Sequence, residues 1–338
     1  MSDSINILFL WKPDTVLVNY IKSGVKNLKN IEFHFINKNA SKENEAKLYS
    51  KANIIIGWRP DEELIKNAKY LKLFINPGAG VKHLIKLFTE LNEKKKITLV
   101  NGHGNSYFVA QHTVALLLVL VNKIILHDKW MRQGKWRLGD SEAASIPLRE
   151  KKIGLLGYGA INKKVHKFLS GFDVEFHILK RSWSKSEKSS AVVKYSSEQL
   201  HKFLKKIDVL IIALPDTKET NNLIDVKELK LLGKEGIIVN VARGPVVNEK
   251  SLFNSLKKKI ITGAAIDVWY NYNPTEKKKK KYPFNFPFDE LDNVVLSPHR
   301  AASPFSDLKR WDEVVENIAK FAKEKKNFLN VVDLKKGY

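Results

Sequence analysis

Three polar side chains follow apolar stretches in the second half of the chain, and their types suit acid–base chemistry on a bound anion. Arg243, Asp267 and His299 each come shortly after a run rich in Val, Ile, Ala or Leu. A half-buried arginine is costly without an anionic partner, and a carboxylate accepts two parallel hydrogen bonds from a guanidinium. A histidine gives or takes a proton near neutral pH. We predict that Arg243 holds a carboxylate and His299 is the acid and base; a purely structural Arg–Asp pair is the alternative.

A glycine-rich turn, G-x-G-x-x-N over residues 157–162, joins an apolar run to the start of a helical pattern. The first glycine permits a tight turn, and the second lets the backbone approach a pyrophosphate resting on the helix N-terminus. Asn162 stands where a third glycine usually allows close packing of helix on strand. This context predicts a dinucleotide-binding turn, with an ordinary strand–helix turn as the alternative. The predicted cofactor contacts in the turn are Gly157, Gly159, Ala160 and Ile161.

Cations end the next predicted strand, where dinucleotide-binding folds hold the adenosine ribose. Proteins that bind NAD usually carry Asp or Glu there to bond the ribose 2′-OH, whereas this chain has Lys180 and Arg181, with Lys185 nearby. Cations attract the 2′-phosphate that distinguishes NADP from NAD. We therefore predict that NADP(H) is preferred and that NAD(H) is possible. The alternative is that these residues are ordinary surface cations of a basic chain.

Apolar, β-branched runs alternate with helical patterns along the chain, which predicts an α/β fold with parallel sheets covered on both faces. Asp61 is a predicted helix N-cap. A long apolar helix is expected over 106–133, ended by Gly134, and an amphipathic helix over 304–326. The interval 269–292 has three prolines and no helical period, so it is expected to be a loop. The predicted strands are 5–11, 31–36, 52–58, 71–76 and 97–100, then 152–157, 174–179, 208–214, 236–242, 262–268 and 293–297.

The length of 338 residues suggests two domains. The absence of cysteine excludes disulfides, zinc–thiolate sites and thiol catalysis. The longest apolar run, 114–121, is too short to cross a bilayer. The first residues lack the basic region and cleavage site of a signal peptide, so we expect a cytoplasmic location.

The chain is basic, with 59 Lys and Arg against 36 Asp and Glu and a net charge of +23. The lysines are spread along the sequence, and the densest run, 277–281, is interpreted as one exposed loop. Since no recognition motif accompanies the charge, we expect a solvated surface with no specific nucleic-acid or membrane partner. His83, His103 and His112 lack metal-ligand spacing, so no metal site is predicted and they are interpreted as packing or surface residues.

Motifs in one consistent order resemble the D-isomer-specific 2-hydroxyacid dehydrogenase family over nearly the whole chain. One resembles the family's substrate loop, and another resembles its helix-entry signature, with Gln111 where glutamate is more usual. A third is highly specific and marks Arg243 as the substrate arginine, while the last matches His299 to the catalytic histidine. The motifs are 76–81, 105–112, 239–244, 263–269 and 297–301.

The resemblance implies two doubly wound parallel-sheet domains. A flavodoxin-like substrate domain comprises residues 1–102 and 304–338, and a Rossmann NAD(P)-binding domain is inserted over 103–303, with the active site in the cleft. The implied reaction transfers hydride between a nicotinamide cofactor and a small 2-oxo or 2-hydroxy acid. The implied assembly is a homodimer joined through the cofactor domain.

The resemblance also implies residue roles. The backbone of residues 79–81 receives the substrate carboxylate together with Arg243, which also polarises the carbonyl oxygen. His299 gives that oxygen its proton. The implied substrate contacts in the loop are Ala79, Gly80 and Val81. The implied cofactor-pocket residues are Leu214, Pro215, Thr220, Val241, Ala242 and Asp267.

Tyr272 departs from the family pattern, which usually places a glutamate there as the partner of the catalytic histidine, or a glutamine in formate dehydrogenases. Without a nearby carboxylate, the protonated form of His299 is less favoured. We expect Tyr272 to orient the ring by a hydrogen bond, as part of the catalytic set; Glu276 folding back is the less favoured alternative. Reduction of the 2-oxo acid is then expected to have an acid-shifted optimum.

Two other functions stay open. A formate-dehydrogenase-like enzyme is suggested by the Asn-Ser pair before the helix and by Asp-Val-Trp-Tyr over 267–270. A cofactor-sensing or interaction protein with weakened catalysis is suggested by Tyr272 and Asn162. Arg243 and His299 favour an enzyme, because a binding module needs neither. The side chain of the substrate is not indicated by the sequence.

Overall fold

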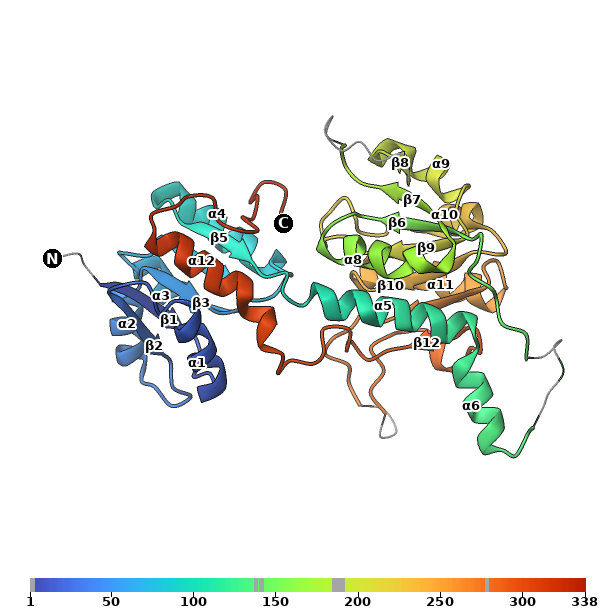
Figure 1. Cartoon of the computed structure of the whole chain (residues 1–338), viewed down its shortest axis with the longest axis horizontal. Helices are drawn as coiled ribbons and strands as arrows, with labels where there is room; N and C mark the ends of the chain where they lie inside the picture. The colour runs from blue at the N-terminus through green and yellow to red at the C-terminus, as the bar shows by residue number, and fades with distance from the viewer. Residues whose placement is uncertain (1–3, 137–138, 140–142, 184–191, 277–279) are drawn as a thin grey trace. The chain divides into compact units, whose positions relative to one another are not determined.

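The computed structural model describes residues 4–136, 139, 143–183, 192–276 and 280–338 (Figure 1). The chain divides into two compact units, which are described separately. Unit 1 comprises Met1–Asn105 and Pro304–Tyr338, and unit 2 comprises Ser106–Ser303.

The first boundary follows residue 105, rather than residue 102 as expected from the sequence. The His103 N–H donates to a Glu313 carboxylate oxygen at 2.5 Å, and Gly104 packs so closely on the Arg310 backbone that a Cβ would lie 2.0 Å from its carbonyl oxygen. These contacts tie residues 103–105 to unit 1.

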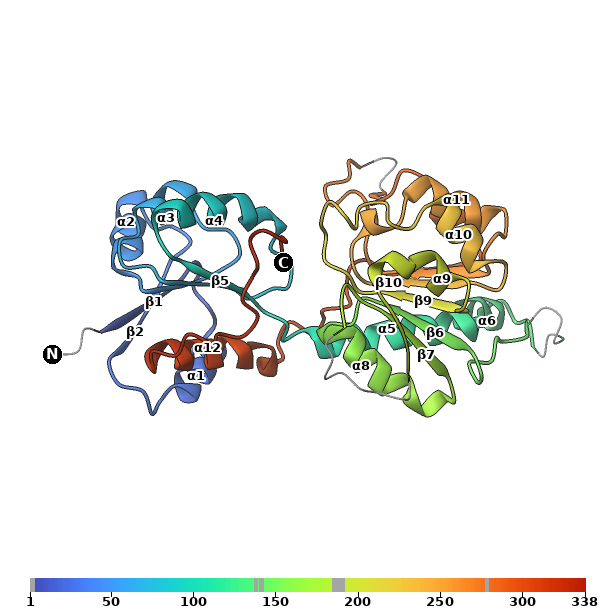
Figure 2. The same ribbon diagram turned by 90° about the horizontal axis from the view of Figure 1, so that it is seen from above.

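Unit 1 is a parallel sheet between two helix layers (Figure 2). Its strand order, β2-β1-β3-β4-β5, is the flavodoxin-like order predicted from the sequence. Helices α1 and α12 cover one face, and α2, α3 and α4 cover the other. The strands are β1 (Ile5–Phe9), β2 (Ile31–Phe35), β3 (Ile54–Ile56), β4 (Leu73–Asn76) and β5 (Thr98–Asn101), and the helices are α1 (Thr15–Gly24), α2 (Lys42–Lys51), α3 (Glu62–Asn67), α4 (Lys82–Lys94) and α12 (Asp312–Ala322).

Local sequence explains how these elements form. Strand β3 is three isoleucines, all buried, as a parallel sheet covered on both faces requires. Helix α3 begins after Asp61, whose carboxylate accepts hydrogen bonds from the N–H groups of Glu63 and Leu64 at 3.0 and 3.1 Å. The predicted N-cap is therefore confirmed.

Unit 2 is a larger parallel sheet of order β12-β11-β10-β9-β6-β7-β8. From β6 the chain adds strands first on one side and then on the other, which is the Rossmann arrangement with its switch point between β6 and β9. The predicted fold class is thus confirmed. The strands are β6 (Lys152–Leu156), β7 (Glu175–Leu179), β8 (Val192–Tyr195), β9 (Val209–Ile212), β10 (Ile237–Asn240), β11 (Gly263–Ile266) and β12 (Val294–Leu296).

Helices cover both faces of this sheet (Figure 2). Apolar side chains of α5 and α8 pack with one face, and those of α9, α10 and α11 pack with the other. Two buried cores result, and every strand end that carries a predicted site residue lies at the same carboxyl edge, because all the strands are parallel. The helices are α5 (Ser106–Val121), α6 (Ile124–Arg132), α8 (Ala160–Leu169), α9 (Leu200–Leu204), α10 (Val226–Leu232) and α11 (Glu249–Lys257).

The expectation of a single helix over 106–133 is wrong. The chain forms α5 and α6, which are bent by 59° relative to one another. Lys123 takes a left-handed conformation with φ of 51°, and the Asn122 side chain donates to the Leu118 carbonyl at 2.9 Å. Both features end a regular helix.

Two other expectations need correction. The prediction of six strands in unit 2 missed β8, a four-residue edge strand that pairs with β7. The C-terminal helix is shorter than 304–326, because a 3-10 turn at Leu308–Trp311 precedes α12.

In the described part of the chain, no single helix is long and apolar enough to cross a membrane, although the bent pair α5 and α6 satisfies the length and composition criteria together.

Candidate active site

The glycine turn follows β6 at the switch point of unit 2. Gly157 has φ of 86°, and a Cβ there would lie 2.5 Å from the Ala213 carbonyl oxygen, so only glycine fits. A Cβ on Gly159 would meet nothing within 4 Å, and α8 begins at the next residue, Ala160. Open space before a helix N-terminus suits the pyrophosphate of a dinucleotide. The turn therefore fits the predicted cofactor.

Asn162 fills the place of the third glycine without disturbing the turn. Its side chain is fully buried, and its amide Nδ2 donates to the Gly157 carbonyl at 2.7 Å. The same nitrogen lies 3.4 Å from the carbonyl oxygens of Leu156 and Ile211. Asn162 thus fastens the turn to β6 and β9 by hydrogen bonds, where a glycine would act only by being small.

Two lysines gather around Trp183 beyond the end of β7. Lys180 Nζ lies 4.4 Å and Lys194 Nζ 5.0 Å from the centre of the Trp183 ring, and the indole N–H donates to the Tyr195 carbonyl at 2.9 Å. Arg181 is exposed beside them. Lys194 belongs to β8, which was not among the predicted strands, so this third cation was not predicted either. Lys185 lies outside the described residues.

Other predicted cofactor residues lie at the same edge of the sheet. Leu214 follows β9 and lies against Gly157, since a Cβ on that glycine would lie 2.9 Å from Leu214 Cδ2. The Thr220 hydroxyl donates to the Pro215 carbonyl at 2.7 Å and shapes the loop after β9. Val241 and Ala242 are buried after β10.

Arg243 follows β10, where the chain turns sharply. Its carbonyl accepts from the Asn240 side chain at 3.1 Å, and its own guanidinium donates to the Ala242 carbonyl at 2.6 Å. The next residue, Gly244, packs on the Trp269 backbone, and a Cβ there would lie 2.3 Å from its carbonyl oxygen. The turn therefore presents a half-buried guanidinium at the carboxyl edge of the sheet.

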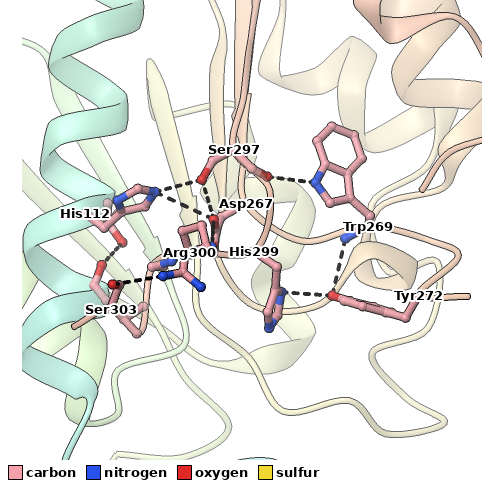
Figure 3. Close-up of polar contacts among 11 residues, drawn as sticks. His112, Asp267, Trp269, Tyr272, Ser297, His299, Arg300 and Ser303 are labelled. Atoms are coloured by element: carbon pink, nitrogen blue, oxygen red, sulfur yellow. Dashed lines mark hydrogen bonds and ion pairs between the residues drawn. The ribbon is translucent and has the colours of Figure 1, made fainter. Parts of the chain in front are cut away.

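Asp267 follows β11 and is almost completely buried, with 2% of its surface exposed. One carboxylate oxygen accepts from the Ser297 hydroxyl at 2.5 Å and from the Arg300 N–H at 2.8 Å, and the other accepts from the Ala301 N–H at 3.0 Å (Figure 3). His112 Nε2 lies 2.9 Å from the Ser297 hydroxyl and 3.6 Å from the carboxylate. Asp267 thus binds the segment that carries His299, while its predicted contact with the cofactor stays a prediction.

His299 has a left-handed backbone, with φ of 57°. This conformation is unfavourable for a side-chain-bearing residue and is kept only where the surroundings fix it. Arg300 and Ala301, the two residues that follow, are the ones whose N–H groups Asp267 binds. The strained backbone of His299 is therefore held in place from β11.

Tyr272 is the hydrogen-bond partner of His299. Its hydroxyl lies 3.1 Å from His299 Nδ1, the two rings are nearly perpendicular, and the Trp269 N–H lies 3.4 Å from the same oxygen (Figure 3). Desolvation and Arg243 lower the pKa of His299 below its ordinary value, and Asp267 only partly opposes them. Desolvation raises the pKa of the Tyr272 phenol. Both shifts favour the neutral forms of the two side chains. Glu276 instead forms an ion pair with Lys281 at 3.6 Å.

The predicted substrate loop lies in unit 1, after β4. Gly80 and Ala79 are exposed, and Val81 is buried at the start of α4. Two buried asparagines, Asn76 and Asn101, donate from their side chains to carbonyl groups of this loop.

Several residues of these clusters were not predicted as site residues. His112 was interpreted as a packing or surface residue but belongs to the Asp267 cluster. Ser297, Lys194, Asn76 and Asn101 were not singled out. A polar residue at the end of an apolar strand was the available signal for the asparagines. Among the described residues, no group of three or more His, Asp or Glu side chains has the geometry to hold a metal ion.

Comparisons with known proteins show which family the chain belongs to. Residues 114–301 match the family model described as "D-isomer specific 2-hydroxyacid dehydrogenase, NAD binding domain". A glyoxylate reductase of Aeropyrum pernix is 33% identical over 277 residues, which are 79% of this chain and 78% of that protein. A glyoxylate reductase of Thermofilum pendens is 31% identical over 261 residues, 75% of this chain and 72% of that protein.

A solved structure shares the fold. The D-isomer specific 2-hydroxyacid dehydrogenase of Xanthobacter autotrophicus, in complex with NADPH and MES, has a TM-score of 0.79 at 22% identity and covers 99% of this chain and 100% of its own. The matched cofactor-binding domain and the curated relatives together show that the chain belongs to the D-isomer specific 2-hydroxyacid dehydrogenase family of oxidoreductases.

Proposed function

We propose that the protein is a cytoplasmic, NADPH-preferring reductase of a small 2-oxo acid, with glyoxylate as the first candidate. The convergence of Arg243, Asp267 and His299 after three adjacent strands carries this proposal, because it combines an anion-binding cation with a proton donor. Relatives named glyoxylate reductase support the choice of substrate.

Arg243 binds the substrate. Its guanidinium donates to the carboxylate and to the carbonyl oxygen, and it stabilises the negative charge that develops on that oxygen during reduction. The backbone of Ala79, Gly80 and Val81, in unit 1, is the second element that we propose to bind a carboxylate. A bound nicotinamide cofactor supplies the hydride.

His299 donates the proton. The protonated imidazole gives it from Nε2 to the substrate oxygen, so that a 2-hydroxy acid forms and the ring becomes neutral. Tyr272 orients the ring in both states, because its hydroxyl can accept from the Nδ1–H group, which the ring keeps before and after Nε2 loses its proton. A glutamate would favour the charged ring, whereas Tyr272 does not.

The cofactor-binding residues fall into two groups. The turn of residues 157–161 would hold the pyrophosphate on the N-terminus of α8. Lys180, Arg181 and Lys194 would hold the 2′-phosphate, with Trp183 beside them. Solved proteins of this fold that contain NADP or NADPH support the preference.

Loss of the arginine tests the proposed reaction. Arg243→Ala should lower kcat/KM for glyoxylate by about 10³-fold, because the charge on the carbonyl oxygen is no longer stabilised, while NADPH binding persists. The rates with glyoxylate, pyruvate and hydroxypyruvate are measured from the loss of NADPH absorbance. Formate is tested with NAD⁺, from the gain of NADH absorbance. Arg149→Ala, at an exposed arginine before β6, is the matched control. Turnover of formate alone, or full activity of Arg243→Ala, would refute the proposal.

The cofactor preference has its own test. Arg181→Ala and Lys194→Ala should each raise the KM for NADPH about tenfold and leave the KM for NADH nearly unchanged, since only NADPH carries the 2′-phosphate. Lys202→Ala on α9 is the control for a lost surface charge. A wild-type enzyme that prefers NADH would contradict the assignment.

The His299–Tyr272 pair predicts the pH dependence. Because the pKa of His299 is lowered, the protonated ring disappears as pH rises through a value below its ordinary 6.5, and reduction should be fastest on the acid side. Tyr272→Glu should raise that pKa and move the alkaline limb of the kcat profile upward by about one unit or more. Tyr272→Phe should lower kcat without such a move. An upward move with Phe, or none with Glu, would count against this role.

We also propose a homodimer joined through unit 2. Ile124, Ile125, Met131 and Trp136, on and after α6, are each more than half exposed, and exposed apolar clusters mark association surfaces. Light scattering of the purified protein should give twice the chain mass, and Ile125→Asp should give monomers. A monomeric wild-type protein would end this proposal.

A further inference from the structure

The loop of residues 76–81 has an unusual arrangement of carbonyl groups. The carbonyls of three successive residues, Gly78, Ala79 and Gly80, all accept hydrogen bonds from buried side-chain amides. Asn76 Nδ2 donates to Gly78 and, at 3.3 Å, to Gly80, and Asn101 Nδ2 donates to Ala79 at 2.7 Å. The loop therefore turns its carbonyls toward the interior of unit 1.

Peptide geometry fixes where the N–H groups point. In a planar trans peptide, the C=O of one residue and the N–H of the next point in opposite directions. With the carbonyls of residues 78–80 directed inward, the N–H groups of Ala79, Gly80 and Val81 are directed outward. These are the three residues proposed to receive the substrate carboxylate. Successive N–H groups on one side of a turn form an anion-binding concavity.

The following helix strengthens this concavity. Helix α4 begins at Lys82, its N-cap Val81 makes no side-chain capping bond, and its first turn contains no acidic residue. The positive end of the helix dipole therefore adds to the loop N–H groups.

The two asparagines are themselves held firmly. They are register partners on neighbouring strands β4 and β5, with 0% and 8% of their surfaces exposed. The Gly102 N–H donates to the Asn76 carbonyl at 2.8 Å and to the Gly78 carbonyl at 3.2 Å. The amide orientations are also determined, because a carbonyl oxygen can accept only from Nδ2.

We propose that Asn76 and Asn101 are positioning residues for the substrate carboxylate. They do not touch the substrate but orient three peptide groups so that their N–H bonds face it. This inference rests on the proposed function and names the side chains that build its carboxylate-binding loop.

We choose Asn101 for substitution, because the hydrogen bond from its Nδ2 to the Ala79 carbonyl orients the peptide between Ala79 and Gly80. Asn101→Asp replaces the donor by a carboxylate that repels the Ala79 carbonyl, and Asn101→Ala removes the donor. Both should raise the inhibition constant of oxalate, a dicarboxylate probe, and the KM for glyoxylate by about five- to tenfold, with Asp at least as severe as Ala. The KM for NADPH should stay unchanged.

Asn92→Ala is the matched control. Asn92 bonds α4 to the start of β5, with Nδ2 2.8 Å from the Phe88 carbonyl and 3.0 Å from the Ile97 carbonyl, but does not contact the loop. It should lower the unfolding temperature and leave oxalate inhibition unchanged. If Asn101→Asp fails to fold, Asn101→Ala decides the matter alone.

A substrate without a carboxylate separates positioning from general damage. The kcat/KM ratio of glyoxylate to its ethyl ester should fall in the Asn101 variants, since only the acid uses the charged contact. Equal losses for acid and ester, or wild-type oxalate inhibition in Asn101→Ala, would overturn the inference while the proposed function stands. A wild-type protein inactive on every 2-oxo acid would overturn both.

Discussion

A buried carboxylate is stable only when hydrogen bonds replace the water it has lost, and Asp267 obtains those bonds from the segment that carries His299. A hydrogen bond to a charged group contributes about 1.5–3 kcal/mol, enough to offset the cost of a left-handed histidine, about 1–3 kcal/mol. The position of the imidazole is thus linked to the end of β11. Ser297 and His112 extend the link to β12 and α5.

The same cluster sets the electrostatics around His299. His299 is influenced by Asp267 from one strand and by Arg243 from another, with opposite effects on its pKa, and desolvation decides the net direction. Because these effects oppose one another, the pKa of His299 depends strongly on whether its hydrogen-bond partner is neutral or acidic. Tyr272 is neutral, so this chain has geometric control of the ring without the charge that a glutamate would add.

Asparagine side chains have a comparable structural role at the loops of both units. Asn162 ties the glycine turn of unit 2 to β6 and β9, and Asn76 and Asn101 donate to three successive carbonyls of the loop after β4 in unit 1. In each case a buried side-chain amide donates to loop carbonyls directly before the start of a helix.

Local sequence was enough to predict the fold class, the two strand–helix series, the Asp61 cap and the positions of Arg243 and His299 after strands, because apolar periodicity and strand-end residues are local properties. It also identified Tyr272 as the partner of His299. It did not reveal the break between α5 and α6, since the left-handed Lys123 has no local signature, or β8, whose four residues become a strand only by pairing with β7. The roles of His112, Lys194, Asn76 and Asn101 were decided by tertiary structure alone, because each depends on atoms far away in the sequence that the sheet brings within hydrogen-bonding or cation–π distance.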